Sequence, residues 1–225
     1  MKIRAKDLII SYNYLITFLT SLTPNIEGLF FYLMVLAKYI SVLLHPFICA
    51  TISFLLLLSN SYLSFSKFLI IAGITFSATV IIPTIQVLIM KSRGRTISMD
   101  IPEREKRIVP FFTSVLIYSI ALIALWIIRS PKPVLILMWA YVFNTIVATI
   151  ITKYWKISIH GMALGGPIAA LGLAVSPLYL WCIFLIFPMT YSRVKLNAHT
   201  TAQVMAGFIL GFLLTVTHFK LLGAL

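Results

Sequence analysis

Residues 67–90 read KFLIIAGITFSATVIIPTIQVLIM and carry no charge after Lys67. An α-helix of about 20 apolar residues crosses the hydrocarbon core of a bilayer, so this stretch is long enough to span it. The run is continuous rather than alternating, which argues against a strand of a β-barrel. Pro83 lies inside it, and membrane helices tolerate proline because neighbouring groups satisfy the freed backbone atoms. We therefore predict a transmembrane helix here.

Similar apolar runs cover most of the remaining chain. Of the 225 residues, 61% are hydrophobic and 10% are charged, whereas about a quarter of a soluble domain is charged. We predict an all-α membrane protein with six or seven transmembrane helices. The predicted spans are residues 38–59, 67–90, 110–128, 133–152, 160–175 (the short run), 178–192 and 200–222.

The N-terminal region differs from the rest of the chain. Its apolar residues, 8–31, are interrupted by Asn13, Pro24, Asn25 and Glu27. We predict that residues 1–37 are an interfacial or lead-in segment, with a weak first span as the alternative. Residues 38–225 are then one transmembrane domain.

The net charge of the chain is +13, from 18 Lys and Arg against 5 Asp and Glu. In a membrane protein such an excess anchors the loops against anionic lipid heads, or it binds an anionic substrate. Nucleic acid is not an expected partner, because no soluble basic domain is present to hold it. The acidic residues are too few and too clustered to suggest a metal site.

Three polar stretches interrupt the apolar runs, at residues 91–110, 153–161 and 192–203. Two spans separate the first stretch from the second, and two more separate the second from the third. An even number of crossings returns the chain to the same side, so all three are expected at one face of the membrane. A site assembled from three loops requires this arrangement.

The third stretch, SRVKLNAHTTAQ, holds Arg193, His199 and Gln203 between two apolar runs. Such groups are costly at bilayer depth unless they are paired or hydrated, which makes them a functional-site hypothesis. His199 and Gln203 are four residues apart and share one helix face. The Gln203 carbonyl can therefore accept a hydrogen bond from the His199 ring and select the tautomer that a nucleophilic histidine needs.

This stretch resembles the third motif of the type 2 phosphatidic acid phosphatase (PAP2) superfamily, which is Ser-Arg, five residues, His, three residues, Asp. Ser192, Arg193 and His199 match it, and Gln203 stands in place of the Asp. An amide holds the ring through a neutral hydrogen bond, roughly half as strong as one to a carboxylate.

The other two family motifs match less well. The second motif is Pro-Ser-Gly-His, and here only Ser158 and His160 agree with it. The first motif is Lys, six residues, Arg-Pro, whereas two residues separate Arg107 from Pro110 in this chain. The resemblance covers residues 91–215, and it implies a bundle like that of the family.

The resemblance implies a metal-independent phosphatase, without a cofactor, that hydrolyses a lipid phosphate or polyprenyl diphosphate through a phosphohistidine. His199 would be the nucleophile, held by Gln203, and His160 would protonate the leaving oxygen and later activate water. The residues implied to bind the substrate phosphate are Arg193, Arg107, Arg104, Ser158, Lys156 and Lys91.

Two other functions fit the same residues. A non-catalytic relative would bind a lipid phosphate without hydrolysing it, and Gln203 together with the altered first motif favours this reading. An anion or lipid transporter is the second, although the chain has no evident inverted repeat and its polar residues gather at one face.

The side of the membrane that carries the site stays open. Lys67, Arg129, Lys132 and Lys220 fall on the opposite face, which leaves 14 of the 18 Lys and Arg residues with the N-terminus and the site. The positive-inside rule then places the site in the cytoplasm. Substrate-binding residues inflate that count, however, and bacterial relatives more often act at the outer face. We predict a multi-pass protein of a bacterial cytoplasmic membrane, with the lipid and the oligomeric state open.

Overall fold

The computed structural model describes residues 28–94, 96, 101 and 103–223. Within these residues the chain forms helices and no strand, which confirms the predicted all-α membrane protein. Six helical spans are long and apolar enough to cross a membrane, and Ile159–Ala174 is a shorter apolar helix beside them. The spans are Gly28–Ser59, Phe65–Ser92, Glu105–Ile127, Lys132–Thr152, Pro177–Lys195 and Thr201–Gly223.

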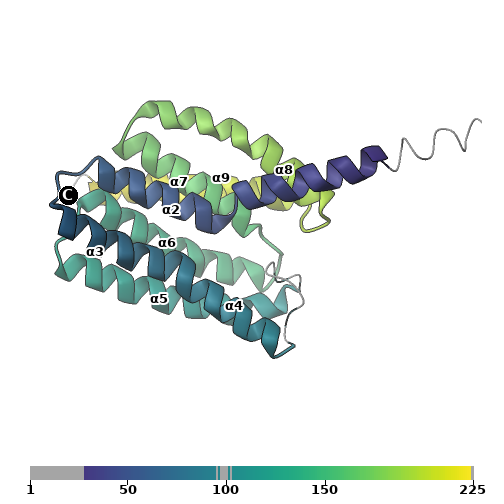
Figure 1. Ribbon diagram of the computed structural model, residues 1–225, viewed down its shortest axis with the longest axis horizontal. Helices are drawn as coiled ribbons and strands as arrows, with labels where there is room; N and C mark the ends of the chain where they lie inside the picture. The colour runs from purple at the N-terminus through teal and green to yellow at the C-terminus, as the bar shows by residue number, and fades with distance from the viewer. Residues whose placement is uncertain (1–27, 95, 97–100, 102, 224–225) are drawn as a thin grey trace, which may run out of the picture.

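The helices of the bundle run roughly side by side, and the helix over residues 28–43 extends past one end (Figure 1). Several spans are composed of more than one helical segment. A π-helical segment, Ser77–Ile81, joins α3 to α4, and a 3-10 segment, Pro177–Leu185, leads into α8. The labelled helices are α2 (Pro46–Ser59), α3 (Phe65–Phe76), α4 (Ile82–Ser92), α5 (Ile108–Ile127), α6 (Lys132–Thr152), α7 (Ile159–Ala174), α8 (Ile186–Lys195) and α9 (Thr201–Gly223).

The first span already includes Gly28, ten residues before the predicted start, and it passes without a break through the boundary predicted between residues 37 and 38. Its helix ends before His45, and Pro46 opens α2, where the missing N–H of proline costs no hydrogen bond. A side chain of α8 holds the helix over residues 28–43 in place, because the Ser192 hydroxyl donates to the Ala37 carbonyl at 2.6 Å. The predicted interfacial segment before residue 28 lies outside the described residues.

Glycines bring α7 and α9 into backbone contact. A methyl group at Gly161 would overlap the Val204 carbonyl, and one at Gly207 would overlap the Ser158 carbonyl. Small residues at about four-residue spacing allow helices in membranes to approach this closely. The Ser158 N–H also donates to the Gln203 carbonyl at 3.3 Å. The N-terminal turns of α7 and α9, which carry the predicted site residues, are therefore held together.

Candidate active site

The three polar stretches meet at one end of the bundle, as the count of spans predicted. Arg104 of the first stretch donates to the Tyr154 carbonyl of the second at 2.7 Å. The second stretch joins the third through the backbone bond between Ser158 and Gln203. At the opposite end, the Lys132 ammonium group donates to the Gly223 carbonyl at 3.2 Å. These contacts show that the three stretches lie at one end of the bundle.

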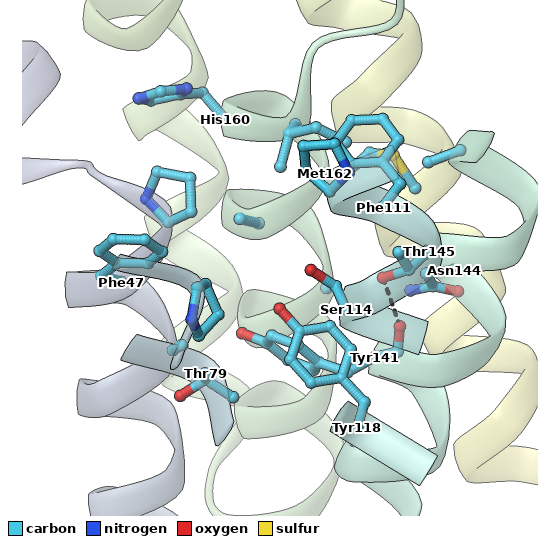
Figure 2. Close-up of a pocket in the computed structure, with 18 of the residues that line it drawn as sticks. Phe47, Thr79, Phe111, Ser114, Tyr118, Tyr141, Asn144, Thr145, His160 and Met162 are labelled. Atoms are coloured by element: carbon cyan, nitrogen blue, oxygen red, sulfur yellow. Dashed lines mark hydrogen bonds between the residues drawn. The ribbon is translucent and has the colours of Figure 1, made fainter. Parts of the chain in front are cut away.

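A cavity of about 210 Å³ opens between the helices at this end. Four of the predicted site residues line it, one from the turn before α5, one from α7, one from α8 and one from the loop before α9. They are Arg107, His160, Arg193 and His199. The same cavity continues between α5 and α6, and Figure 2 shows His160 near one end of the view and Tyr118 and Tyr141 toward the other.

His199 and Gln203 make the predicted contact, with 3.0 Å between Nδ1 and Oε1. The Thr200 N–H donates to the same Oε1 at 3.2 Å, and the Gln203 N–H donates to the Thr200 hydroxyl at 3.3 Å. The two bonds between Thr200 and Gln203 form a capping box at the start of α9. Because a backbone N–H can only donate, the Gln203 atom must be the oxygen, and His199 must donate from Nδ1. The lone pair of the neutral ring is therefore on Nε2.

The environment of His199 keeps its ring neutral. Burial lowers the pKa of His199 to about 3, the charge of Arg107 adds to this, and the hydrogen bond to Gln203 opposes it. Lys156 and Arg193 lower it further. At neutral pH the ring thus has an unprotonated Nε2, which is the form that a nucleophile requires.

Two guanidinium groups border the cavity and make it an anion-binding environment. Arg193 is 1% exposed, and its Nη1 donates to the Ser41 hydroxyl at 2.7 Å. Arg107 is 7% exposed, and its Nε donates to the Ile101 carbonyl at 2.7 Å. These bonds orient the planar groups, whose donor geometry suits phosphate oxygens. The amides of Ala198 and His199 bond back to the Arg193 carbonyl, which closes the turn after α8.

The other predicted phosphate-binding residues do not line the cavity. Arg104 is partly exposed and bonds to the Tyr154 carbonyl, which makes it a link between two loops. Lys91 is exposed at the end of α4. The Ser158 hydroxyl accepts the Gly161 N–H at 3.3 Å and caps α7. The charge of Lys156 lowers the pKa of His199.

Two residues that sequence reasoning did not select also belong to this end of the cavity. His45 lines it, and its ring lies 5.2 Å from that of His160 between centroids, at an interplanar angle of 88°. Its Nδ1 accepts a hydrogen bond from the Phe47 N–H at 3.3 Å and so caps α2. In the sequence, the position of His45 directly before Pro46 indicated a helix start and not a site residue. Ser41, the partner of Arg193, carried no signal in the sequence.

Metal-ligating side chains do not gather in the described part of the chain, where no group of three or more His, Cys, Asp or Glu is placed to hold an ion. Glu103 instead pairs with Lys106 at 3.0 Å, and this bond lowers the pKa of the Glu103 carboxyl. Glu105 pairs with Arg104 at 3.1 Å. The acidic residues described therefore neutralise neighbouring basic residues.

Comparison with family models, curated proteins and solved structures finds no match for this chain.

Proposed function

We propose that this chain is an integral membrane phosphatase that hydrolyses a lipid phosphate or polyprenyl diphosphate through a phosphohistidine intermediate. The observation that carries the proposal is the state of His199: its Nδ1 donates to Gln203, and its Nε2 lone pair belongs to a buried ring. Arg107, Arg193 and His160 line the same cavity. A neutral nucleophile beside two guanidinium groups is the combination that metal-free phosphoryl transfer needs.

In the first step, His199 Nε2 attacks the terminal phosphorus while the bond from phosphorus to the leaving oxygen breaks. His160, in its protonated form, gives a proton to that oxygen, and the lipid alcohol leaves, or the polyprenyl monophosphate where the substrate is a diphosphate. Arg193 and Arg107 donate to the equatorial phosphate oxygens, on which most of the charge resides. The positive charge that the His199 ring gains is delocalised toward Nδ1–H, which stays bonded to Gln203.

In the second step, His160 is neutral and takes a proton from a water molecule. The water oxygen attacks phosphorus, the bond from phosphorus to Nε2 breaks, and inorganic phosphate leaves. His199 returns to its neutral form with the proton on Nδ1, and His160 is protonated for the next turnover. No proton has to cross the His199–Gln203 hydrogen bond at any stage.

The membrane setting supports a lipid as the substrate. The cavity continues from the four polar residues into the space between apolar spans, where a chain attached to the phosphate can be buried. The chain is an integral multi-pass membrane protein by its six spans. We propose the bacterial cytoplasmic membrane as its location, with anionic lipid heads as partners of the basic loops.

A second candidate is a non-catalytic protein that binds lipid phosphate. One observation favours it: the capping box gives the Gln203 side chain a structural role that needs no catalysis. The two candidates share the anion site and differ only in turnover.

The test is release of inorganic phosphate from a panel of lipid phosphates, in detergent and a metal chelator. Native protein is compared with His199→Ala and with His218→Gln, which alters a histidine of α9 packed against Trp139 and Phe143 rather than the cavity. We expect the His199 variant alone to lose activity, together with an acid-labile, base-stable phosphoenzyme in the native protein. Equal activity of native protein and His199→Ala would refute the phosphohistidine mechanism. Binding without turnover in a folded native sample would favour the second candidate.

A further inference from the structure

His45 lines the cavity beside His160, and the proposed reaction gives it no part. It is the residue that caps the start of α2, whereas His160 lies in the first turn of α7. The two imidazole rings are 5.2 Å apart between centroids and nearly perpendicular, at 88°. Aromatic rings favour this edge-to-face arrangement. A residue distant in the sequence thus packs directly against the proposed acid–base group.

The hydrogen bond of His45 to its own helix excludes it from proton transfer. Its Nδ1 accepts the Phe47 N–H at 3.3 Å, so the neutral ring carries its proton on Nε2. Neither nitrogen then has a lone pair for a further proton unless this bond breaks. His45 can therefore influence proton transfer only through its neighbour.

The His45 ring is itself held in place. The Phe47 ring lies against it at 4.6 Å between centroids and 68° between planes, and the Phe47 N–H bonds to its Nδ1. Phe47 and His160 lie toward the same side of the view in Figure 2. A ring that is bonded to the backbone and packed against a second ring is a rigid support for a third.

His160 has a fixed backbone, and its ring needs one orientation. Ser158 caps α7 by accepting the Gly161 N–H, and α9 comes so close that a methyl group at Gly161 would overlap the Val204 carbonyl. The freedom that remains is rotation of the ring. A half-turn about the Cβ–Cγ bond places carbon atoms where the nitrogens were, so proton transfer requires one orientation. The perpendicular ring of His45 restricts this rotation.

We propose that His45 is a positioning residue, which holds the His160 ring in the orientation that passes a proton to the leaving oxygen and takes one from water. The inference rests on the proposed function for the role of His160, whereas the restraint on the ring can be tested without turnover. A general acid contributes roughly a hundredfold to ten-thousandfold in rate, and a misplacement of about 1 Å can cost roughly a hundredfold. Loss of the restraint should therefore remove a large part of what His160 contributes.

Two variants separate the contact between the rings from the helix cap. His45→Asn loses the ring and keeps an oxygen that can cap α2, because asparagine is among the most favoured residues at this position. His45→Phe keeps a ring against His160 and loses the cap. Thr51→Val is the matched control on α2, since the Thr51 hydroxyl bonds to the Phe47 carbonyl and does not line the cavity. The unfolding temperature checks each fold, and His45→Ser is a second variant with a cap and no ring.

The kinetic readout is the dependence of kcat/KM on the leaving group, because kcat/KM reports the steps up to its departure. A long-chain alkyl phosphate needs a proton on its leaving oxygen, whereas a nitrophenyl phosphate with the same chain does not. We expect His45→Asn to lower kcat/KM roughly tenfold to a hundredfold for the first substrate and roughly threefold or less for the second. His45→Phe should keep most of the activity, and in a His160→Asn background His45→Asn should cause no further loss.

The restraint itself is measured as the mobility of the His160 ring. The chain has four histidines, so protein labelled with ¹³C at the histidine Cε1 gives few signals, and His160→Asn assigns one of them. We expect ¹³C relaxation to show a more mobile His160 ring in His45→Asn than in native protein, His45→Phe or Thr51→Val.

Unchanged kcat/KM and unchanged ring mobility in a folded His45→Asn protein would overturn the inference and leave the phosphatase intact. Loss of activity in His45→Phe alone would assign the effect to the helix cap, and equal loss for both substrates in both variants would assign it to a contact of the His45 N–H with substrate; either result would also overturn the inference. Absence of turnover in native protein would refute the phosphatase, and the mobility of the ring would still decide whether His45 restrains His160.

Discussion

Replacing Gln203 with Glu changes the charge beside the proposed nucleophile and leaves the size of the side chain unchanged. The Gln203 oxygen accepts from His199 Nδ1 at 3.0 Å and from the Thr200 N–H at 3.2 Å. Glu has the same length and can keep both bonds, whereas Asp is one methylene group shorter and cannot keep both distances. A carboxylate in the first turn of α9 is also favoured by the helix dipole.

The expected gain follows from the change in one hydrogen bond. A neutral hydrogen bond contributes about 0.5–1.5 kcal/mol, and one to a charged group contributes about 1.5–3 kcal/mol. The difference of about 1 kcal/mol acts where the ring gains positive charge, in the transition state, so kcat should rise roughly fivefold with little change in KM. The carboxylate also raises the pKa of His199 from about 3 by roughly 1–3 units, which still leaves the ring neutral at pH 7.

The assay compares initial rates of phosphate release at pH 7 for native protein, Gln203→Glu and Thr201→Glu. Thr201 is exposed and begins α9, so its variant adds the same charge to the same helical turn without contacting the ring. We expect a gain with Gln203→Glu alone. An equal change in both variants would attribute the effect to the general charge of the loop. Loss of activity in a folded Gln203→Glu protein would refute the idea that this side chain acts through His199.

Three further predictions concern pH, packing and the anion site. Because the pKa of His199 is about 3 in the folded protein and about 6.5 in the unfolded chain, its contribution to stability should fall by about 1.4 kcal/mol per pH unit below pH 6.5 down to about pH 3, as chemical unfolding at several pH values can measure. Gly207→Ala forces a methyl group against the backbone of α7 and should lower stability on the order of 1–3 kcal/mol in thermal unfolding, whereas Gly73→Ala, with open space around it, should not. Ser41→Ala removes one hydrogen-bond acceptor of Arg193 and should lower kcat/KM roughly tenfold in the phosphate-release assay, with the unfolding temperature as the control for fold.

The sequence by itself determined the features that depend on local periodicity. The apolar runs were sufficient to locate the spans, since crossing a bilayer requires about 20 apolar residues whatever surrounds them. The number of spans then placed the three polar stretches at one end. The contact between His199 and Gln203 was predictable for the same reason, because residues four apart meet within one helix.

Only the tertiary structure decided which distant residues share the cavity. Arg104 and Arg107 are equivalent candidates in the sequence, but the path of the loop before α5 turns Arg107 inward and Arg104 toward Tyr154. His45 meets His160 because the first span breaks where α2 begins.

The inner part of the cavity depends in the same way on how α5 and α6 pack. Ser114 and Tyr118 share one face of α5, and Tyr141 and Asn144 share one face of α6, but only the packing of the two helices brings the two pairs together. Contacts of this kind follow from the packing of whole helices, and the periodicity of one segment does not contain that information.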